Sequence, residues 1–134
     1  MSLRILTLVV VLGASSLSSL GCGKATLGRQ DLEQSLSRHY IDLRWGRIPA
    51  AAQHVSPDLQ PAFVEDWQAR AQQIQIQDFD VVQIVENEDG ETADVYVQLS
   101  WVESATMSLK NATLKQTWVK TDAGWKAAGL LELE

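Results

Sequence analysis

Two neighbouring side chains, His39 and Tyr40, are the best candidates for chemistry in this chain of 134 residues. An imidazole titrates near neutral pH and can act as a general acid or base, and a phenol can donate a hydrogen bond to a ligand oxygen. Asp66 and Asp78 are the carboxylates that such a site would use as partners. The alternative is a core histidine that bonds a backbone carbonyl, with Tyr40 filling space beside it.

No stronger catalytic or metal-binding signature occurs in the sequence. It has no Gly-rich phosphate loop, no nucleophile elbow and no group of ligands with metal-binding spacing. Acidic residues gather around the turn at 87–91, but their spacing is not that of an EF-hand loop. We therefore expect no metal and no cofactor, and we expect the acidic turn to be a solvated hairpin tip.

Cys22, the only cysteine, follows a short apolar segment. Arg4 precedes the apolar residues 5–12, and this run is much shorter than the roughly 20 residues that span a bilayer. The segment is therefore predicted to direct export. Because no second cysteine exists, the domain that follows must fold without disulfides or thiolate metal sites.

The residues before this cysteine, Ser19-Leu20-Gly21-Cys22, resemble the bacterial lipoprotein signal, in which the chain is cut before a cysteine that becomes acylated. Ser19 and Leu20 stand one position away from the usual pattern. The resemblance implies a cleaved signal peptide over 1–21 and a lipid on Cys22 that holds the protein at the cell envelope. Gly23 in place of Asp implies the outer membrane if the organism is Gram-negative. The alternative is an ordinary secretory signal that leaves a free thiol.

The spacing of apolar residues predicts three helices in the domain at 29–134, after a tether at 22–28. A helix over 30–45 carries His39 on its apolar stripe. Gly46 is a natural stop, and Pro49 begins a short second helix. Ser56-Pro57 is expected to cap a third helix that runs to about residue 73.

From Ile74 onward the period changes to two, which predicts about four long antiparallel strands. A bulge near Asp78 reconciles two opposite phases in the first strand, and residues 88–91 form a hairpin turn. Trp118 and Trp125 flank the last turn, where we expect a cross-strand pair. The fold class is therefore α+β, with helices packed on one face of a strongly curved sheet.

The order of these elements resembles the NTF2-like superfamily, whose last two strands often turn as in Trp118-Val119-Lys120-Thr121-Asp122-Ala123-Gly124-Trp125-Lys126. The resemblance implies a cone-shaped domain with an interior pocket, and often a homodimer formed through the outer face of the sheet. The residues expected to line that pocket come from two helices and one strand. They are His39, Tyr40, Phe63, Trp67 and Trp101.

Ile41 and Trp45 lie off the apolar stripe of the first helix, on one common side. They are candidates for a contact with another subunit or a partner. The alternative, which we favour, is that the short helix after Pro49 covers Trp45. His54 is expected to be a surface or loop residue.

The formal net charge of −6 argues against nucleic acid as a partner and against electrostatic attachment to anionic lipid. The membrane would then be bound through the lipid on Cys22. Three functions are compatible with the sequence. The favoured one is a non-catalytic envelope lipoprotein whose domain binds a small apolar ligand or an envelope protein. The others are an assembly module that dimerises through the sheet or the Ile41/Trp45 face, and a small-molecule isomerase or dehydratase that uses His39 and Tyr40.

Overall fold

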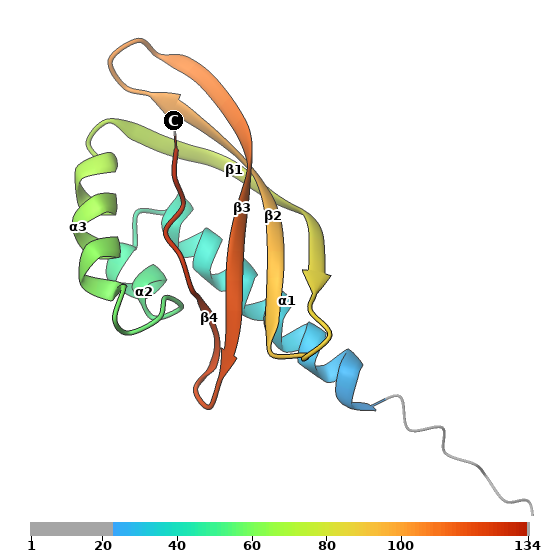
Figure 1. Cartoon of the computed structure of the whole chain (residues 1–134). Coiled ribbons are helices and arrows are strands. Elements are labelled where there is room, and N and C mark those ends of the chain that lie inside the picture. Colours follow the sequence, from blue (N-terminus) through green and yellow to red (C-terminus); the bar gives the residue numbers. More distant parts are fainter. Residues whose placement is uncertain (1–22, 134) are drawn as a thin grey trace, which may run out of the picture.

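Three helices precede four strands in the computed structural model, which describes residues 23–133 (Figure 1). The elements are α1 (Gly23–Arg44), α2 (Ile48–Ala52), α3 (Gln60–Arg70), β1 (Ile74–Glu86), β2 (Thr92–Glu103), β3 (Ser108–Thr121) and β4 (Gly124–Ala127). The predicted leader and Cys22 lie outside the described residues. Within 23–133, no helix is both long and apolar enough to cross a membrane.

Helix α1 is longer than the sequence predicts at its start and ends as expected. It begins at Gly23, so residues 23–28 of the expected tether are helical. Its end is set by Gly46, whose φ of 69° is a left-handed conformation that other residues adopt only with strain. The predicted apolar stripe faces the core, where Leu32, Leu36 and Leu43 are buried.

The short helix after Pro49 is confirmed as α2, but the predicted cap of the third helix is wrong. Helix α3 begins at Gln60, and no side chain caps it. Ser56 lies in a turn instead: its N–H donates to Ala127 O at 2.9 Å, and its carbonyl accepts from Leu59 N–H at 2.9 Å. The backbone of Ser56 thus joins the loop to the end of the sheet, which moves the helix start to residue 60.

The sheet is antiparallel throughout, in the order β1-β2-β3-β4. The predicted bulge near Asp78 is confirmed, because the register of β1 against β2 shifts between Ile76 and Asp78. A second shift, between Val81 and Gln83, was not predicted. Each bulge bends and twists a strand locally, so β1 curves around the helices that cover this face of the sheet (Figure 1).

Strand β2 is the centre of the core, and its alternation is as predicted. The residues of its inner face are all buried: Ala93, Val95, Val97, Leu99 and Trp101. On the outer face, Asp94 accepts a hydrogen bond from Thr117 at 2.9 Å and pairs with Lys115 at 3.5 Å. This part of the outer face is therefore polar.

The predicted pairing of Trp118 with Trp125 is wrong. The turn pairs Thr121 with Gly124, so the register places Trp118 opposite Ala127 and Trp125 opposite Lys120. Both indoles are buried, but they are not directly opposite each other.

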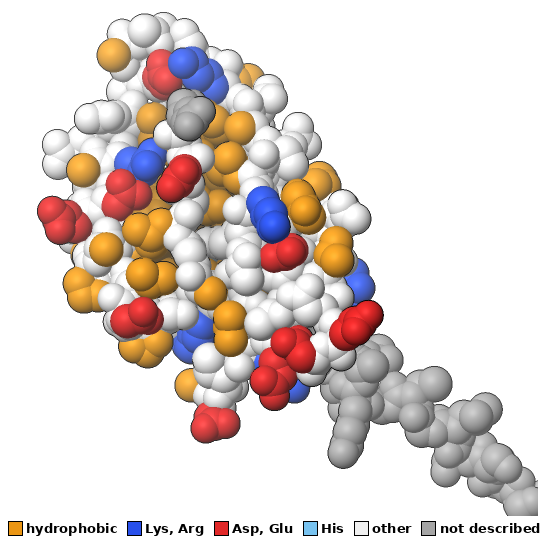
Figure 2. All heavy atoms as spheres, viewed as in Figure 1, with side chains coloured by type: hydrophobic (Ala, Val, Ile, Leu, Met, Phe, Trp, Pro, Cys, Tyr) orange, Lys and Arg blue, Asp and Glu red, His pale blue; other side chains and the backbone are white. Residues whose placement is uncertain are grey.

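Acidic side chains gather at the end of the molecule where the strand hairpins turn (Figure 2). The turn between β1 and β2 carries Glu88, Asp89 and Glu91, all exposed. Asp89 accepts the backbone N–H of Glu91 at 2.9 Å, and these hydrogen bonds lower its pKa. Asp89 thus stabilises the turn, and the exposed acidic residues around it form a solvated hairpin tip, as predicted.

Candidate functional site

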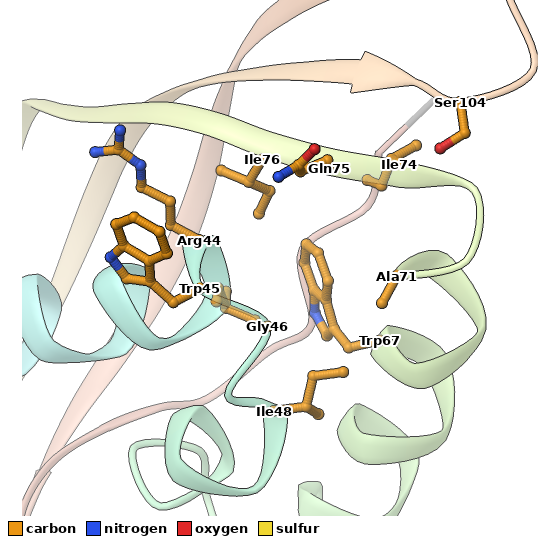
Figure 3. Close-up of a pocket in the computed structure, with 11 residues that line it drawn as sticks. Arg44, Trp45, Gly46, Ile48, Trp67, Ala71, Ile74, Gln75, Ile76 and Ser104 are labelled. Carbon is orange, nitrogen blue, oxygen red and sulfur yellow. The ribbon is translucent and has the colours of Figure 1, made fainter.

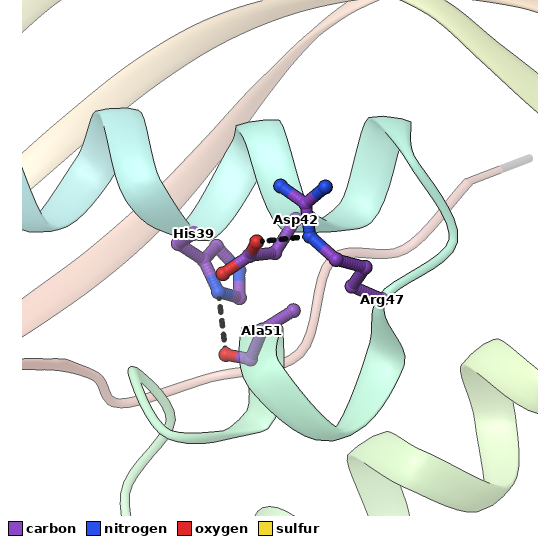
Figure 4. A network of polar contacts seen from close by, with 4 residues as sticks. All are labelled: His39, Asp42, Arg47 and Ala51. Atoms are coloured by element: carbon purple, nitrogen blue, oxygen red, sulfur yellow. Dashed lines mark hydrogen bonds and ion pairs between the residues drawn. The ribbon is translucent and has the colours of Figure 1, made fainter.

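His39 points from α1 toward α2 and is sealed from solvent, with 0% of its surface exposed (Figure 4). Its Nδ1 lies 2.9 Å from the carbonyl oxygen of Ala51. Because a carbonyl only accepts, Nδ1 must carry the proton and Nε2 must be the bare nitrogen. Nε2 has no hydrogen-bond partner among residues 23–133. Burial lowers the pKa of His39 from 6.5 to about 4, so the ring is neutral at physiological pH.

Aromatic rings surround His39 on several sides. Ring centroids of Tyr40, Phe63 and Trp118 lie 5.1, 5.6 and 5.5 Å from that of the imidazole. The His54 ring is at 6.3 Å, in the turn after α2, where it is half-buried as a loop residue. Burial and the charge of Lys126 lower the pKa of His54. The structure thus brings three of the expected pocket residues together, and it packs them against one another.

Tyr40 belongs to a buried polar network centred on Gln116, which the sequence analysis did not single out. The Tyr40 hydroxyl donates to Gln116 Oε1 at 2.6 Å, and the Trp118 indole N–H donates to the same oxygen at 3.0 Å. Gln116 Nε2 donates to the carbonyl oxygen of Gly129 at 3.1 Å. Burial raises the pKa of Tyr40 well above its usual range. The phenol is therefore neutral and already bonded within the protein.

The carboxylates expected near His39 are used elsewhere. Asp66 pairs with Arg70 at 2.9 Å, and exposed Asp78 accepts the backbone N–H of Phe79 at 2.9 Å. Asp42, one turn after His39, binds Arg47 at 2.8 Å (Figure 4). In the part of the chain that the structure describes, no group of His, Cys, Asp and Glu side chains is arranged to hold a metal ion.

A cavity of about 340 Å³ lies instead at the C-terminal end of α1, between that helix, α3 and the start of β1 (Figure 3). Of the five residues expected to line a pocket, only Trp67 borders this cavity. Trp101 is buried within the sheet, opposite Ile76. The lining comes from five parts of the chain and comprises Leu43, Arg44, Trp45, Gly46, Ile48, Trp67, Ala71, Ile74, Gln75, Ile76 and Ser104.

The cavity walls combine polar and apolar groups. The Trp67 ring stands between Ile48 and β1 in Figure 3, and its buried indole N–H has no partner among the described residues. On β1, Ile74 and Ile76 complete the apolar wall. Arg44 carries the only charged side chain of the lining.

Trp45 is 66% exposed, so the expectation that the short second helix covers it is wrong. The indole turns toward the Arg44 guanidinium, whose carbon lies 5.6 Å from the ring centroid (Figure 3). Ile41, one turn earlier, is 38% exposed. Both side chains are thus partly exposed within residues 23–133, and their role as a contact surface stays a prediction.

A comparison with models of protein families gave no match, and neither did a comparison with curated protein sequences. Solved structures do share the fold. A ketosteroid isomerase-like protein from Erwinia carotovora atroseptica is 14% identical, with a TM-score of 0.58 over 74% of this chain and 89% of that one. A candidate polyketide cyclase from Xanthomonas campestris pv. campestris is 12% identical, with a TM-score of 0.58 over 77% and 93%.

A third structure with this fold is a candidate Ca/calmodulin-dependent kinase II association domain from Exiguobacterium sibiricum. It is 18% identical, with a TM-score of 0.58 over 75% of this chain and 87% of that one. Identities this low establish a shared fold and no shared activity. The chain is thus an α+β domain with the NTF2-like fold, in which helices pack on a curved antiparallel sheet.

Proposed function

We propose that this protein is an envelope lipoprotein, anchored through Cys22, whose NTF2-like domain binds a small apolar molecule without transforming it. The binding site is the cavity lined by Trp67, Ile48, Ile74 and Ile76. Small-molecule sites are concave and combine apolar side chains with a few polar groups, and this cavity offers both.

The observation that carries the proposal is the separation of the titratable groups from the cavity. General acid–base chemistry needs a titratable group within hydrogen-bond reach of the substrate. No His, Tyr, Asp or Glu borders the cavity. His39 bonds Ala51 and Tyr40 bonds Gln116, both in the packed core. An isomerase or dehydratase built on these two residues would need the core to open, so binding is the better supported function.

Binding is tested by blocking the cavity from its rim. Ala71 is exposed and borders the cavity, so Ala71→Trp would fill the entrance without disturbing the core. Ala69→Trp is the matched control, because Ala69 is exposed on the same segment and does not line the cavity. The probe is N-phenyl-1-naphthylamine, a neutral dye that fluoresces in apolar surroundings, titrated into the full-length chain in lipid nanodiscs.

We expect saturable fluorescence from the wild type and from Ala69→Trp above the signal of empty nanodiscs. Ala71→Trp should reduce this protein-dependent signal at least fivefold. Equal signals from the two variants would refute binding in this cavity.

Anchoring is tested by metabolic labelling with radioactive palmitate in a bacterial host. The wild type should carry the label and remain with the membrane fraction. Cys22→Ser should lose both the label and the membrane association, since several acyl chains are what make such an anchor stable. Equal labelling of the two proteins would end the lipoprotein proposal.

Assembly is the second candidate function, supported by one specific observation. Trp45 is the most exposed of the tryptophans, and exposed large apolar side chains often mark contact surfaces. One protein of the same fold is described as an association domain. The polar outer face around Asp94 and Lys115 speaks against a dimer formed there. The α1 surface carrying Ile41 and Trp45 is the better site for a partner.

A further inference from the structure

The cavity has one charged group, and that charge is positive. Arg44 borders the cavity, and no carboxylate lines it. Arg29, Arg47 and Arg70 each pair with an acidic side chain. Arg44 makes no ion pair within residues 23–133. A cation at the rim of a cavity selects ligands by charge, because it attracts a bound anion and repels a bound cation.

The position of the guanidinium is fixed without using its hydrogen-bond donors. The Arg44 group lies over the Trp45 ring, with its carbon 5.6 Å from the centroid. A cation–π contact of this kind uses no hydrogen-bond donor, so the N–H groups of the guanidinium stay available for a carboxylate or similar anion. Trp45 is therefore placed to support Arg44 at the rim.

Polar groups that are not charged complete the rim. Gln75 of β1 and Ser104 just after β2 both border the cavity, and their side chains can donate hydrogen bonds (Figure 3). The buried residues of the lining are Trp67 and three aliphatic residues. The cavity thus joins an apolar interior to a rim of hydrogen-bond donors with one positive charge.

We propose that the cavity takes an amphipathic anion: an apolar or aromatic body against Trp67, and a single anionic head group bound by Arg44. This inference rests on the proposed binding function and adds the chemical class of the ligand. The protein carries a formal net charge of −6, so its surface as a whole disfavours anions. Preference for an anion at this cavity would therefore come from Arg44.

The test uses two probes that share one skeleton and differ in charge, 4-phenylbutyrate and 4-phenyl-1-butanol. Affinities for the full-length chain in nanodiscs are measured by ligand-observed NMR at pH 7. Arg44→Gln removes the charge, and Arg38→Gln is the matched control. Arg38 is an exposed arginine on the same helix, and it does not line the cavity.

We expect the wild type to bind the carboxylate more tightly than the alcohol. Arg44→Gln should weaken 4-phenylbutyrate about two- to fivefold, the upper part of the range for one exposed charge pair, and leave the alcohol unchanged. Arg38→Gln should change neither affinity.

Three outcomes would overturn the inference. If Arg44→Gln weakens both probes equally, or if Arg38→Gln has the same effect as Arg44→Gln, the rim does not select anions, although binding in the cavity stands. If the wild type binds neither probe and Ala71→Trp has no effect on the neutral dye, the proposed binding function fails as well.

Discussion

Two regions on α1, five residues apart, make opposite use of similar side chains. Around His39, an imidazole, a phenol and an indole are packed together, and the hydrogen bonds of Tyr40 and Trp118 are completed by Gln116. Around Arg44, an arginine and two indoles border open space. Residue types that could do chemistry therefore build the core, and the accessible site is made of residues with no catalytic signature.

The comparison shows that the burial of a side chain, and whether its hydrogen bonds are already used, decide more than its residue type whether it can bind a ligand. His39 has the ring that catalysis favours, yet its N–H is held by Ala51 and its other nitrogen is sealed in the core. Arg44 is an ordinary surface residue by sequence, yet its donors remain available at a cavity. A functional site needs groups that a ligand can reach.

The largest effect should follow from opening the closed region. Trp118 is fully buried, and it donates to Gln116 at 3.0 Å. Trp118→Ala should lower the free energy of unfolding by about 3–5 kcal/mol, because it leaves a large cavity and removes one of the two donors to Gln116 Oε1. Leu109→Ala, at a 67% exposed position on the same strand, is the control and should cost under about 0.5 kcal/mol. Urea unfolding measures both. A loss below about 1 kcal/mol for Trp118→Ala would show that this region is loosely packed.

The next effect is a dependence of stability on pH. Burial lowers the pKa of His39 to about 4 from 6.5, so between these pH values the unfolded chain binds a proton that the folded chain does not. The free energy of unfolding should fall as pH falls from 6.5 to 4, with His39 contributing on the order of 3 kcal/mol of the loss. Above pH 6.5 the contribution of His39 should not change with pH.

His39→Leu loses the bond to Ala51 and should be less stable at pH 7, but its stability should decline less toward pH 4. His54→Gln is the comparison, since the half-buried His54 also has a lowered pKa and should contribute a smaller slope of the same sign. Urea unfolding at several pH values gives both slopes. Identical slopes for the wild type and His39→Leu would contradict a neutral, sealed His39.

Much of the closed region could be predicted from the sequence, because it depends on local signals. The stripe of α1, the stop at Gly46 and the alternation of β2 each follow from periodicity or backbone conformation. The cap at Ser56 was wrong because the Ser56 N–H bonds Ala127, a partner from the far end of the chain. Only the three-dimensional structure could show that preference.

The open region could not be predicted, for a related reason. The cavity is assembled from the ends of several elements, with Ile48, Trp67 and Ile74 each contributed by a different one. Their spacing in the sequence carries no signal. Whether the space between the helices and the sheet is filled depends on the total volume of the side chains that point into it, and the sequence does not give that orientation. Gln116 was likewise indistinguishable from any other polar strand residue before its partners Tyr40 and Gly129 were known.

A smaller effect should separate the parts of the closed network. Tyr40→Phe removes one donor to Gln116 Oε1, which still accepts from Trp118. The loss should be about 1 kcal/mol, the usual net contribution of one hydrogen bond. Tyr96→Phe, on the outer face of β2, is the matched control and should change stability by less than about 0.5 kcal/mol. If the two variants lose the same amount by thermal or urea unfolding, the Tyr40 bond adds nothing to the core.

The smallest effect on stability belongs to the open region and separates its two possible uses. Trp45 is 66% exposed, so Trp45→Ala should change the free energy of unfolding by less than about 0.5 kcal/mol. If Trp45 supports Arg44 at the rim, the variant should bind 4-phenylbutyrate more weakly than the wild type while its mass in analytical ultracentrifugation stays the same. If Trp45 is instead an assembly contact, the wild type should sediment as an oligomer that Trp45→Ala dissociates, with ligand affinity unchanged. Because folding is nearly unaffected in either case, these two readouts assign Trp45 to the cavity or to a subunit interface.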